Sequence, residues 1–463
     1  MTLDTVTLSR LQFAFTIGFH ILWPAYSIGI ACFVALLNTI WLSTGKIIYR
    51  NLMRFWLRLF ALGFVMGVVT GVVLSYEIGA NWSVFSRITG NVLGPLFMYE
   101  ALTAFFLEGG FIGILLFGEA RVGRRVHLFS SLMVALGTML SAFWVLAANS
   151  WMQTPQGATL GRDGVFHVND WAAVIFNPSF RYRFAHMVCA SFVSGVFVVA
   201  GVSAIFLLRQ RNREPAQAAL SLAMWLGLFL VPLQIFLGDQ HGLNTRRYQP
   251  MKLAAIEARW DTGRGVPLTL FALPDQKKAT NLWSIDIPHL GSLILTHSWN
   301  GKMRGLKEVP AQDRPYVPLV FFAFRAMVGV GIVLLTLAII GAYLRRRGHL
   351  FTTKWFFIAL ILASPLGFVA TIAGWIVTEA GRQPYVVYGL LRTADGASPL
   401  VAVNVGVTLI IFIIVYALLL AGFFWFFAQT IIRGSELTAL PDSSPRSARG
   451  RMRATPELLK GAP

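Results

Sequence analysis

Several ionisable residues lie inside, or at the end of, long apolar segments of the sequence. Among them are His20, Glu100, Glu108, His186, Arg325 and Glu379. An ionisable side chain surrounded by lipid is costly, so each of these residues is a candidate for function. Imidazole and the methionine thioether are axial ligands of haem iron, and Met327 lies in one of the same segments. A carboxylate is a weaker iron ligand, and it can also carry protons.

Each of these residues, taken alone, also has a structural interpretation. A histidine in a membrane is often hydrogen-bonded between helices, and a methionine such as Met327 often fills the core. Buried glutamates such as Glu100 and Glu108 can belong to a proton or ion path, or can form structural hydrogen bonds. Residue types alone therefore leave open a haem protein, an ion or solute transporter, and a structural role.

The segments that position these residues are predicted to be transmembrane helices. Of the 463 residues, 56% are hydrophobic and 13% are charged, which excludes a water-soluble enzyme, a disordered protein and a disulfide scaffold. The formal net charge of +19 is typical of basic loops between membrane helices and does not indicate nucleic-acid binding. A helix needs about 20 apolar residues to cross the hydrocarbon core. Nine such segments occur, at Leu11–Trp41, Trp56–Tyr76, Val92–Gly118, Leu128–Ala148, Phe184–Leu208, Ala219–Gly238, Val317–Leu344, Trp355–Thr378 and Val401–Ile432.

The basic residues of the short connections predict the orientation. Lys and Arg are concentrated after the first, third, fifth and seventh segments, as at Arg345, Arg346 and Arg347, and in the C-terminal tail. The positive-inside rule places these connections in the cytoplasm. We therefore expect an all-α integral membrane protein whose N-terminus lies outside and whose C-terminus lies in the cytoplasm, as an odd number of spans requires.

In this orientation the candidate residues share one depth. His20, Glu100, His186 and Met327 follow the outer ends of their helices closely, within ~15 Å of the outer surface at a rise of 1.5 Å per residue. Glu379 reaches the same level from the end of the eighth helix. This coincidence of depth, and no single residue, favours haem binding in one outer layer over the separate structural interpretations.

Two glutamates of the third segment suggest a proton relay. Glu100 and Glu108 are ~80° apart around a helix and ~12 Å apart along it, so they lie roughly on one side. Glu108 is the deeper, which suits a relay from the cytoplasm, although a structural carboxylate is the alternative. Arg325 lies two residues before Met327 and points elsewhere, so either a haem propionate or a structural ion pair could be its partner.

The chain divides into four predicted parts. Residues 1–238 form helices one to six, 239–316 a folded external segment, 317–432 helices seven to nine, and 433–463 a basic cytoplasmic tail. Long connections are usually functional or disordered. The external segment contains Lys252–Trp260 (KLAAIEARW), which is predicted to be a helix.

The residues resemble a known family. The chain is similar to subunit I of the bacterial cytochrome bd-type ubiquinol oxidases, including the cyanide-insensitive oxidases, over about residues 8–430. The motifs that carry the resemblance are Arg10–Phe15 (RLQFAF), Tyr99–Gly109 (YEALTAFFLEG), Ser141–Gln153 (SAFWVLAANSWMQ), Arg183–Ser191 (RFAHMVCAS), Gly238–Asp239, Lys252–Ala258 (KLAAIEA), Phe324–Gly329 (FRAMVG) and Gly374–Pro384 (GWIVTEAGRQP). Their order along the chain, together with nine spans, makes the resemblance specific.

The resemblance implies three haems and their ligands. It implies that His186 and Met327 are the axial ligands of a low-spin haem b. His20 and Glu379 would ligate the two high-spin haems, a haem b and the chlorin haem d or a further haem b in its place. The resemblance leaves open which of the two residues serves which haem. Glu100 would lie beside this pair and contribute to ligation or deliver the last proton.

The resemblance also implies further site residues. Glu108 and Ser141 would belong to the proton route, Arg325 and Arg382 would balance haem charge, and Lys252 and Glu257 would bind quinol. The external segment lacks the long insertion of larger relatives, and Tyr385 follows the GRQP sequence where many relatives have tryptophan. Both departures fit the cyanide-insensitive branch, in which haem d is less secure.

The function implied is that of a terminal quinol oxidase in the bacterial cytoplasmic membrane. It would oxidise ubiquinol outside and reduce O2 to water with cytoplasmic protons, so that a proton-motive force arises without pumping. The partners implied are a haem-free membrane subunit II and small single-span subunits. The alternative is a membrane cytochrome b that transfers electrons from quinol without reducing oxygen.

Overall fold

The computed structural model describes residues 4–434, and within them nine helical segments are long and apolar enough to cross a membrane. The nine predicted spans are thereby confirmed. They are formed by α1 (Thr5–His20) with α2 (Leu22–Thr44), α3 (Ile47–Asn81), α4 (Ser83–Tyr99) with η1 (Glu100–Phe105) and α5 (Phe106–Phe117), α6 (Glu119–Gln153), α8 (Phe180–Leu208), α9 (Arg213–Tyr248), α12 (Val317–Arg346), α13 (Lys354–Ala363) with α14 (Leu366–Ala380), and α15 (Ala402–Arg433).

The shorter elements lie in the connections. They are β1 (Ala158–Leu160), β2 (Phe166–Val168), α7 (Trp171–Ile175), α10 (Pro250–Ile256), β3 (Gly263–Arg264), β4 (Leu268–Asp275), β5 (Thr280–Ile287), α11 (Leu290–Thr296), β6 (Lys302–Met303), η2 (Leu306–Glu308), η3 (Ala311–Asp313), β7 (Tyr385–Val387), β8 (Leu391–Arg392) and η4 (Ala394–Gly396). The strands form four antiparallel pairs, β1 with β2, β3 with β6, β4 with β5, and β7 with β8.

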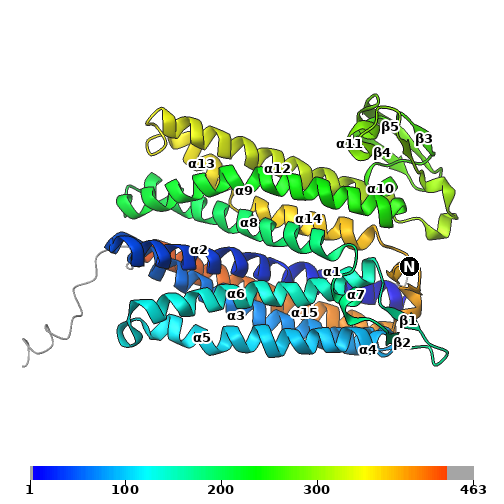
Figure 1. Ribbon diagram of the computed structural model, residues 1–463, viewed down its shortest axis with the longest axis horizontal. Helices are drawn as coiled ribbons and strands as arrows, with labels where there is room; N and C mark the ends of the chain where they lie inside the picture. The colour runs from blue at the N-terminus through cyan, green and yellow to red at the C-terminus, as the bar shows by residue number, and fades with distance from the viewer. Residues whose placement is uncertain (1–3, 435–463) are drawn as a thin grey trace, which may run out of the picture.

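All of these small elements gather at one end of the bundle, which we call the hairpin end (Figure 1). The N-terminal start of α1 lies at the same end, and α15 finishes at the opposite end. In the view of Figure 1, α8, α9, α12, α13 and α14 lie in one half of the bundle, and α1 to α6 with α15 lie in the other. The α2 helix packs on both α3 and α8 and so joins the two halves.

Two spans are interrupted close to a candidate residue. The first breaks between α1 and α2, directly after His20. Pro24 explains this break, because a proline ring clashes with the carbonyl group four residues earlier. The third span changes from an α-helix to a π-helix, η1, which begins at Glu100. Single turns of π-helix are rare in proteins, and those that occur are often found at functional sites.

The external segment differs from its prediction at both ends of α10. The preceding helix, α9, continues to Tyr248, ten residues into the segment predicted as external, and stops before Gln249 because a residue that precedes proline avoids the helical conformation. The predicted helix Lys252–Trp260 ends earlier, at Ile256. Ala258 has a φ of 46°, so the chain turns away directly after Glu257.

The packing of the bundle changes along its length. A large apolar cluster joins α2, α3, α8, α9 and α13, with Phe60, Phe197 and Phe356 completely buried in it. The buried side chains of α1 are different, because they are the polar residues Ser9, Gln12 and Thr16. The described residues therefore combine an apolar cluster shared by α2, α3, α8, α9 and α13 with polar buried side chains along α1.

Candidate functional site

His20 is oriented by a hydrogen bond to the neighbouring helix. Its Nδ1 lies 2.8 Å from the hydroxyl oxygen of Thr70 in α3. The Thr70 hydroxyl donates its own proton to the carbonyl oxygen of Met66, 2.8 Å away, so it accepts from His20. Nδ1 therefore carries the proton, and Nε2 has the free lone pair that a metal ligand needs.

His186 belongs to α8 and faces α9. Its Nε2 is 3.3 Å from the amide nitrogen of Gln234. Its Nδ1 is buried and has no hydrogen-bond partner among the described residues, and neither has the amide oxygen of Gln234. A Cβ placed at Gly238 would lie 3.2 Å from the His186 ring. The Nδ1 atom of His186 therefore has hydrogen-bonding or ligating capacity that no described residue uses. A side chain at position 238 would reduce the space beside the imidazole ring.

Met327 stands against a glycine of the facing helix. A Cβ at Gly374 in α14 would lie 2.9 Å from the sulfur of Met327 in α12, which is closer than real carbon atoms approach. The α12 helix packs on α9 as well as on α14. Gly374 therefore leaves room for the thioether on the side of α14.

Glu379 is held by donors from three directions. Its Oε1 accepts hydrogen bonds from Asn149, at 3.0 Å, and from Gln153, at 3.2 Å. Its Oε2 forms an ion pair with Arg382. The two amide residues come from the last turns of α6, so this helix positions the carboxylate of α14.

Three buried cations surround this single carboxylate. Arg183 donates a hydrogen bond to Asn149 at 2.6 Å, and Lys252 donates one to Gln153 at 2.5 Å. Each cation is therefore linked to Glu379 through one intervening amide side chain. Arg382 contacts it directly, and its Nε and one terminal nitrogen have no partner among the described residues. The cluster has an excess of positive charge.

The electrostatics of the cluster are unfavourable as it stands. Burial lowers the pKa of the Lys252 ammonium well below its ordinary value, and the nearby charge of Arg183 lowers it further. Burial also lowers the pKa of Arg382, although Glu379 acts in the opposite direction. A buried cation needs a counter-charge. The donor set therefore fits an additional anionic group such as a carboxylate of a bound cofactor.

The structure brings Glu100 and Ser141 into contact. The Ser141 hydroxyl donates to Oε1 of Glu100, and the two oxygens are 2.8 Å apart. Glu108 is 7% exposed and lies against Gly137, where a Cβ would approach the Glu108 side chain to 2.5 Å. Glu100 of η1 and Glu108 of α5 therefore both face α6, which carries Ser141 and Gly137.

Arg325 has a partner that its spacing left open. Its guanidinium forms an ion pair with Glu257 at 3.0 Å and also donates to the carbonyl oxygen of Thr269. Of the two predicted partners, this structure has the ion pair. The pair fixes the end of α10 and the start of β4 against α12, and it engages one of the two predicted quinol-binding residues.

Lys252 and Glu257 are both buried, at 3% and 6% exposure, and they face different neighbours. The turn after Glu257 lies between them and the rest of the external segment. Lys252 donates to Gln153, which in turn donates to Glu379, whereas Glu257 forms the ion pair with Arg325. The α10 helix is therefore linked by hydrogen bonds to the cluster around Glu379 and by an ion pair to α12.

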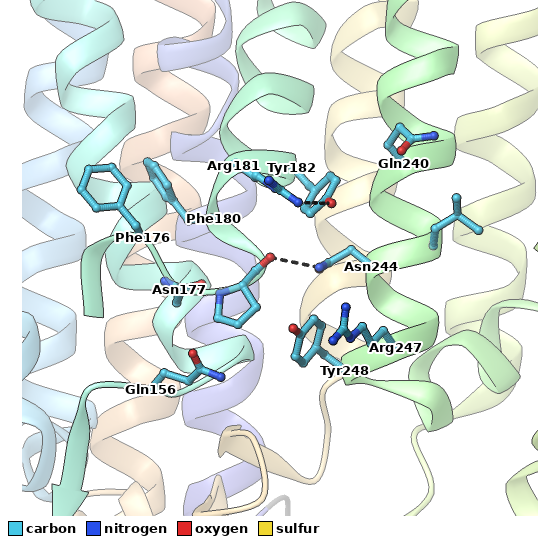
Figure 2. A pocket seen from close by; sticks show the side chains of 12 residues that line it. Gln156, Phe176, Asn177, Phe180, Arg181, Tyr182, Gln240, Asn244, Arg247 and Tyr248 are labelled. Atoms are coloured by element: carbon cyan, nitrogen blue, oxygen red, sulfur yellow. Dashed lines mark hydrogen bonds between the residues drawn. The ribbon is translucent and has the colours of Figure 1, made fainter. Parts of the chain in front are cut away.

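Two cavities, each of about 640 Å³, flank the end of α9. Leu243 and Arg247 line both of them. Figure 2 shows the first cavity, where Arg181, Arg247 and Tyr248 surround the hydrogen bond between Asn244 and the carbonyl oxygen of Pro178. The second is bordered by α10, through Leu253 and Ala254, and by β6.

Several residues of the site were not predicted. Contacts between helices that are distant in the sequence bring in Arg183, Gln153 and Thr70. Their residue types do not indicate a site, because polar residues are ordinary near the ends of spans and threonine is ordinary within them. Glu77 is 1% exposed but follows the predicted second segment by one residue. A wider boundary for that segment would have revealed it as a further ionisable residue within a span.

Comparisons with known proteins agree on one family. The family model for cytochrome bd terminal oxidase subunit I matches residues 8–435. Cytochrome bd ubiquinol oxidase subunit 1 of Bacillus subtilis is 37% identical over 446 residues, covering 94% of this chain and 95% of the relative. Cytochrome bd-II ubiquinol oxidase subunit 1 of Escherichia coli is 31% identical, covering 90% and 94%. The solved structure of bd oxidase from Geobacillus thermodenitrificans superposes with a TM-score of 0.85 at 29% identity, over 95% of this chain and 100% of that chain.

Proposed function

The chain belongs to the cytochrome bd terminal oxidase subunit I family, and we propose that it carries the haems at which ubiquinol oxidation is coupled to the reduction of O2 to water. Membership makes it a subunit of a terminal quinol oxidase and a multi-pass protein of the bacterial inner membrane. The observation that carries the finer proposal is the cation-rich cluster around Glu379, together with two buried imidazoles, His20 and His186, that each keep one nitrogen without a partner in the described part of the chain.

The residues present fit haem groups. His186 and Met327 would hold a low-spin haem b, since the imidazole has an unpartnered nitrogen and the thioether is given room by Gly374. His20 and Glu379 would hold a high-spin haem b and a haem d, or a further haem b in its place. When bound, these groups supply electron transfer and an iron that takes O2.

The excess cations of the cluster would compensate the propionate charges of these haems. Arg382 has two unpartnered nitrogens, and Lys252 and Arg183 are close to the same carboxylate. Arg325 contributes less directly, since it is engaged by Glu257. Arg382, Lys252 and Arg183 would therefore supply most of the balancing charge.

Quinol would dock at the external segment, at the proposed outer face. The α10 helix borders the second cavity, and its buried residues Lys252 and Glu257 link that region to Glu379 and Arg325. A quinol bound there would transfer its protons to outward-facing groups, and subunit II would complete the complex. The hairpin end is then the outer face, as the basic connections at the opposite end predict.

Protons for water formation would come from the cytoplasm along α5 and α6. Glu108 would hold a proton in the bundle and pass it towards Glu100, and the Ser141 hydroxyl bonded to Glu100 can relay it. Each charge that crosses the membrane in this way stores about 2.3 kcal/mol per 100 mV. Placement of the two half-reactions would thus generate a proton-motive force without a pump.

The test is oxygen uptake by the complex purified with subunit II and reconstituted in liposomes, with a short-chain ubiquinol as donor. We expect oxygen consumption with alkalinisation of the compartment that corresponds to the cytoplasm. His20→Ala should abolish uptake while the low-spin haem spectrum is retained. Haem reduction by quinol without oxygen consumption would favour the electron-transfer cytochrome instead.

A further inference from the structure

A polar face of α1 is buried against α3. Ser9, Thr16 and His20 lie within about 20° of one direction around α1, since residues seven and eleven apart nearly coincide on a helix of 3.6 residues per turn. Thr70, Glu77 and Asn81 repeat the same spacing on α3. Two side-chain bonds join the faces, from Thr16 to Glu77 and between His20 and Thr70.

This face runs from the hairpin end to His20. Ser9 to His20 spans about 17 Å along α1, and Thr70 to Asn81 spans the same length along the antiparallel α3. Asn81 lies at the hairpin end, where the backbone oxygens of Ala80 and Asn81 accept from Ser398. The α15 helix closes the third side, because Thr408 donates to the Gln12 side chain at 3.1 Å.

Part of the hydrogen-bonding capacity of this region is not used by the protein groups that the structure describes. Four side-chain atoms on α1, α3 and α15 are buried and have no partner among the described residues: Ser9 Oγ, Glu77 Oε1, Asn81 Nδ2 and Tyr416 Oη. Their residues are at most 5% exposed. Leaving such groups unpaired in the interior is energetically unfavourable. Buried water commonly satisfies several such groups at once.

We infer that a file of water molecules fills the boundary of α1, α3 and α15 and connects the outer face with the His20 site, with Glu77 as its central hydrogen-bonding group. Its role, which rests on the proposed function, is to let the water formed at the pair of high-spin haems, one of which His20 would hold, leave towards the outer face. Gln12, Thr16 and Thr70 line the same boundary and are themselves buried. Glu77 belongs to neither the ligand set nor the proposed proton relay.

The first test detects the water and needs no turnover. Radiolytic hydroxyl-radical labelling of the intact complex modifies side chains beside bound water even where they are buried. We expect Tyr416 to be labelled several-fold more than Phe60, which is equally buried in the apolar core. Labelling of Tyr416 at the level of Phe60 would overturn the inference, whether or not the complex consumes oxygen.

The second test uses a matched pair of substitutions. Glu77→Gln keeps the shape and polarity of the side chain, so labelling of Tyr416 and oxygen uptake should both be retained. Glu77→Met has a similar length without polar oxygens, so labelling should fall and oxygen uptake at saturating quinol should slow several-fold, with haem content unchanged. Thr16→Val provides the same comparison if the Met variant does not assemble.

The outcomes separate the inference from the proposed function. Slower uptake in Glu77→Met with full uptake in Glu77→Gln supports the water route. Equal uptake in both variants overturns the route. Absence of oxygen uptake in the unaltered complex, with Tyr416 still labelled, refutes the proposed oxidase and the exit role together but leaves the water file in place.

Discussion

Gly374→Ala should disturb the low-spin haem through Met327 alone. The added Cβ would stand 2.9 Å from the Met327 sulfur, where ordinary contacts begin at about 3.5 Å, so the thioether must move by several tenths of an ångström. Overpacking of this kind costs about 1–3 kcal/mol. If that strain falls on the bond to iron, and the thioether favours the reduced state, the midpoint potential of the low-spin haem should fall by about 40–130 mV.

The assay is a spectroelectrochemical titration of the purified complex. The matched control is Gly329→Ala on the same helix as Met327, because a Cβ there meets no atom within 4 Å. Gly374→Ala should lower the potential and alter the low-spin band, whereas Gly329→Ala should leave both unchanged. Equal potentials in the two variants would refute the assignment of Met327 as an axial ligand.

Three further predictions concern the proton relay, the external segment and the cation cluster. Ser141→Ala removes the donor to Glu100, and a hydrogen bond to a carboxylate is worth about 1.5–3 kcal/mol. The substitution should slow oxygen reduction in flash experiments without changing the quinol KM. An unchanged rate would exclude Ser141 from the relay. Glu257→Gln breaks the ion pair with Arg325 and should raise the quinol KM more than it lowers kcat, and a KM equal to that of the unaltered enzyme would count against a quinol site at α10. Haem-depleted protein should become more stable as pH rises, because folded Lys252, with its lowered pKa, binds fewer protons than the unfolded chain between that pKa and the ordinary value of 10.5. Propionates should suppress this slope in the holoprotein, so parallel Tm–pH curves for the two forms would contradict the proposed charge balance.

The spans could be predicted because lipid imposes a simple rule on sequence. A segment such as Phe184–Leu208 has to be long and apolar, and α8 indeed covers it within a single helix. The boundaries followed local chemistry less well. The polar residues after Gly238 suggested that the sixth helix ends there, but α9 continues to Tyr248 and stops only before Pro250. The predicted helix Lys252–Trp260 ends early because Ala258 adopts a left-handed conformation.

The contacts of the site depended on folding and could not be read from spacing. Arg325 pairs with Glu257, which is 68 positions away in an irregular segment. The π-helix at Glu100 alters the angular relation between Glu100 and Glu108 that a regular helix would give, because its hydrogen bonds reach one residue further. Arg183 and Gln153 joined the cluster only because α6 and α8 bring their ends beside α14.

The most direct measurement is the absorption spectrum of the dithionite-reduced complex, purified with subunit II, with and without carbon monoxide. We expect haem b bands together with a band that moves on addition of carbon monoxide, and a red-shifted chlorin band if haem d is present. Haem b bands that carbon monoxide leaves unchanged would contradict an oxygen-reducing site. Absence of haem from the intact complex would contradict the proposed ligands altogether.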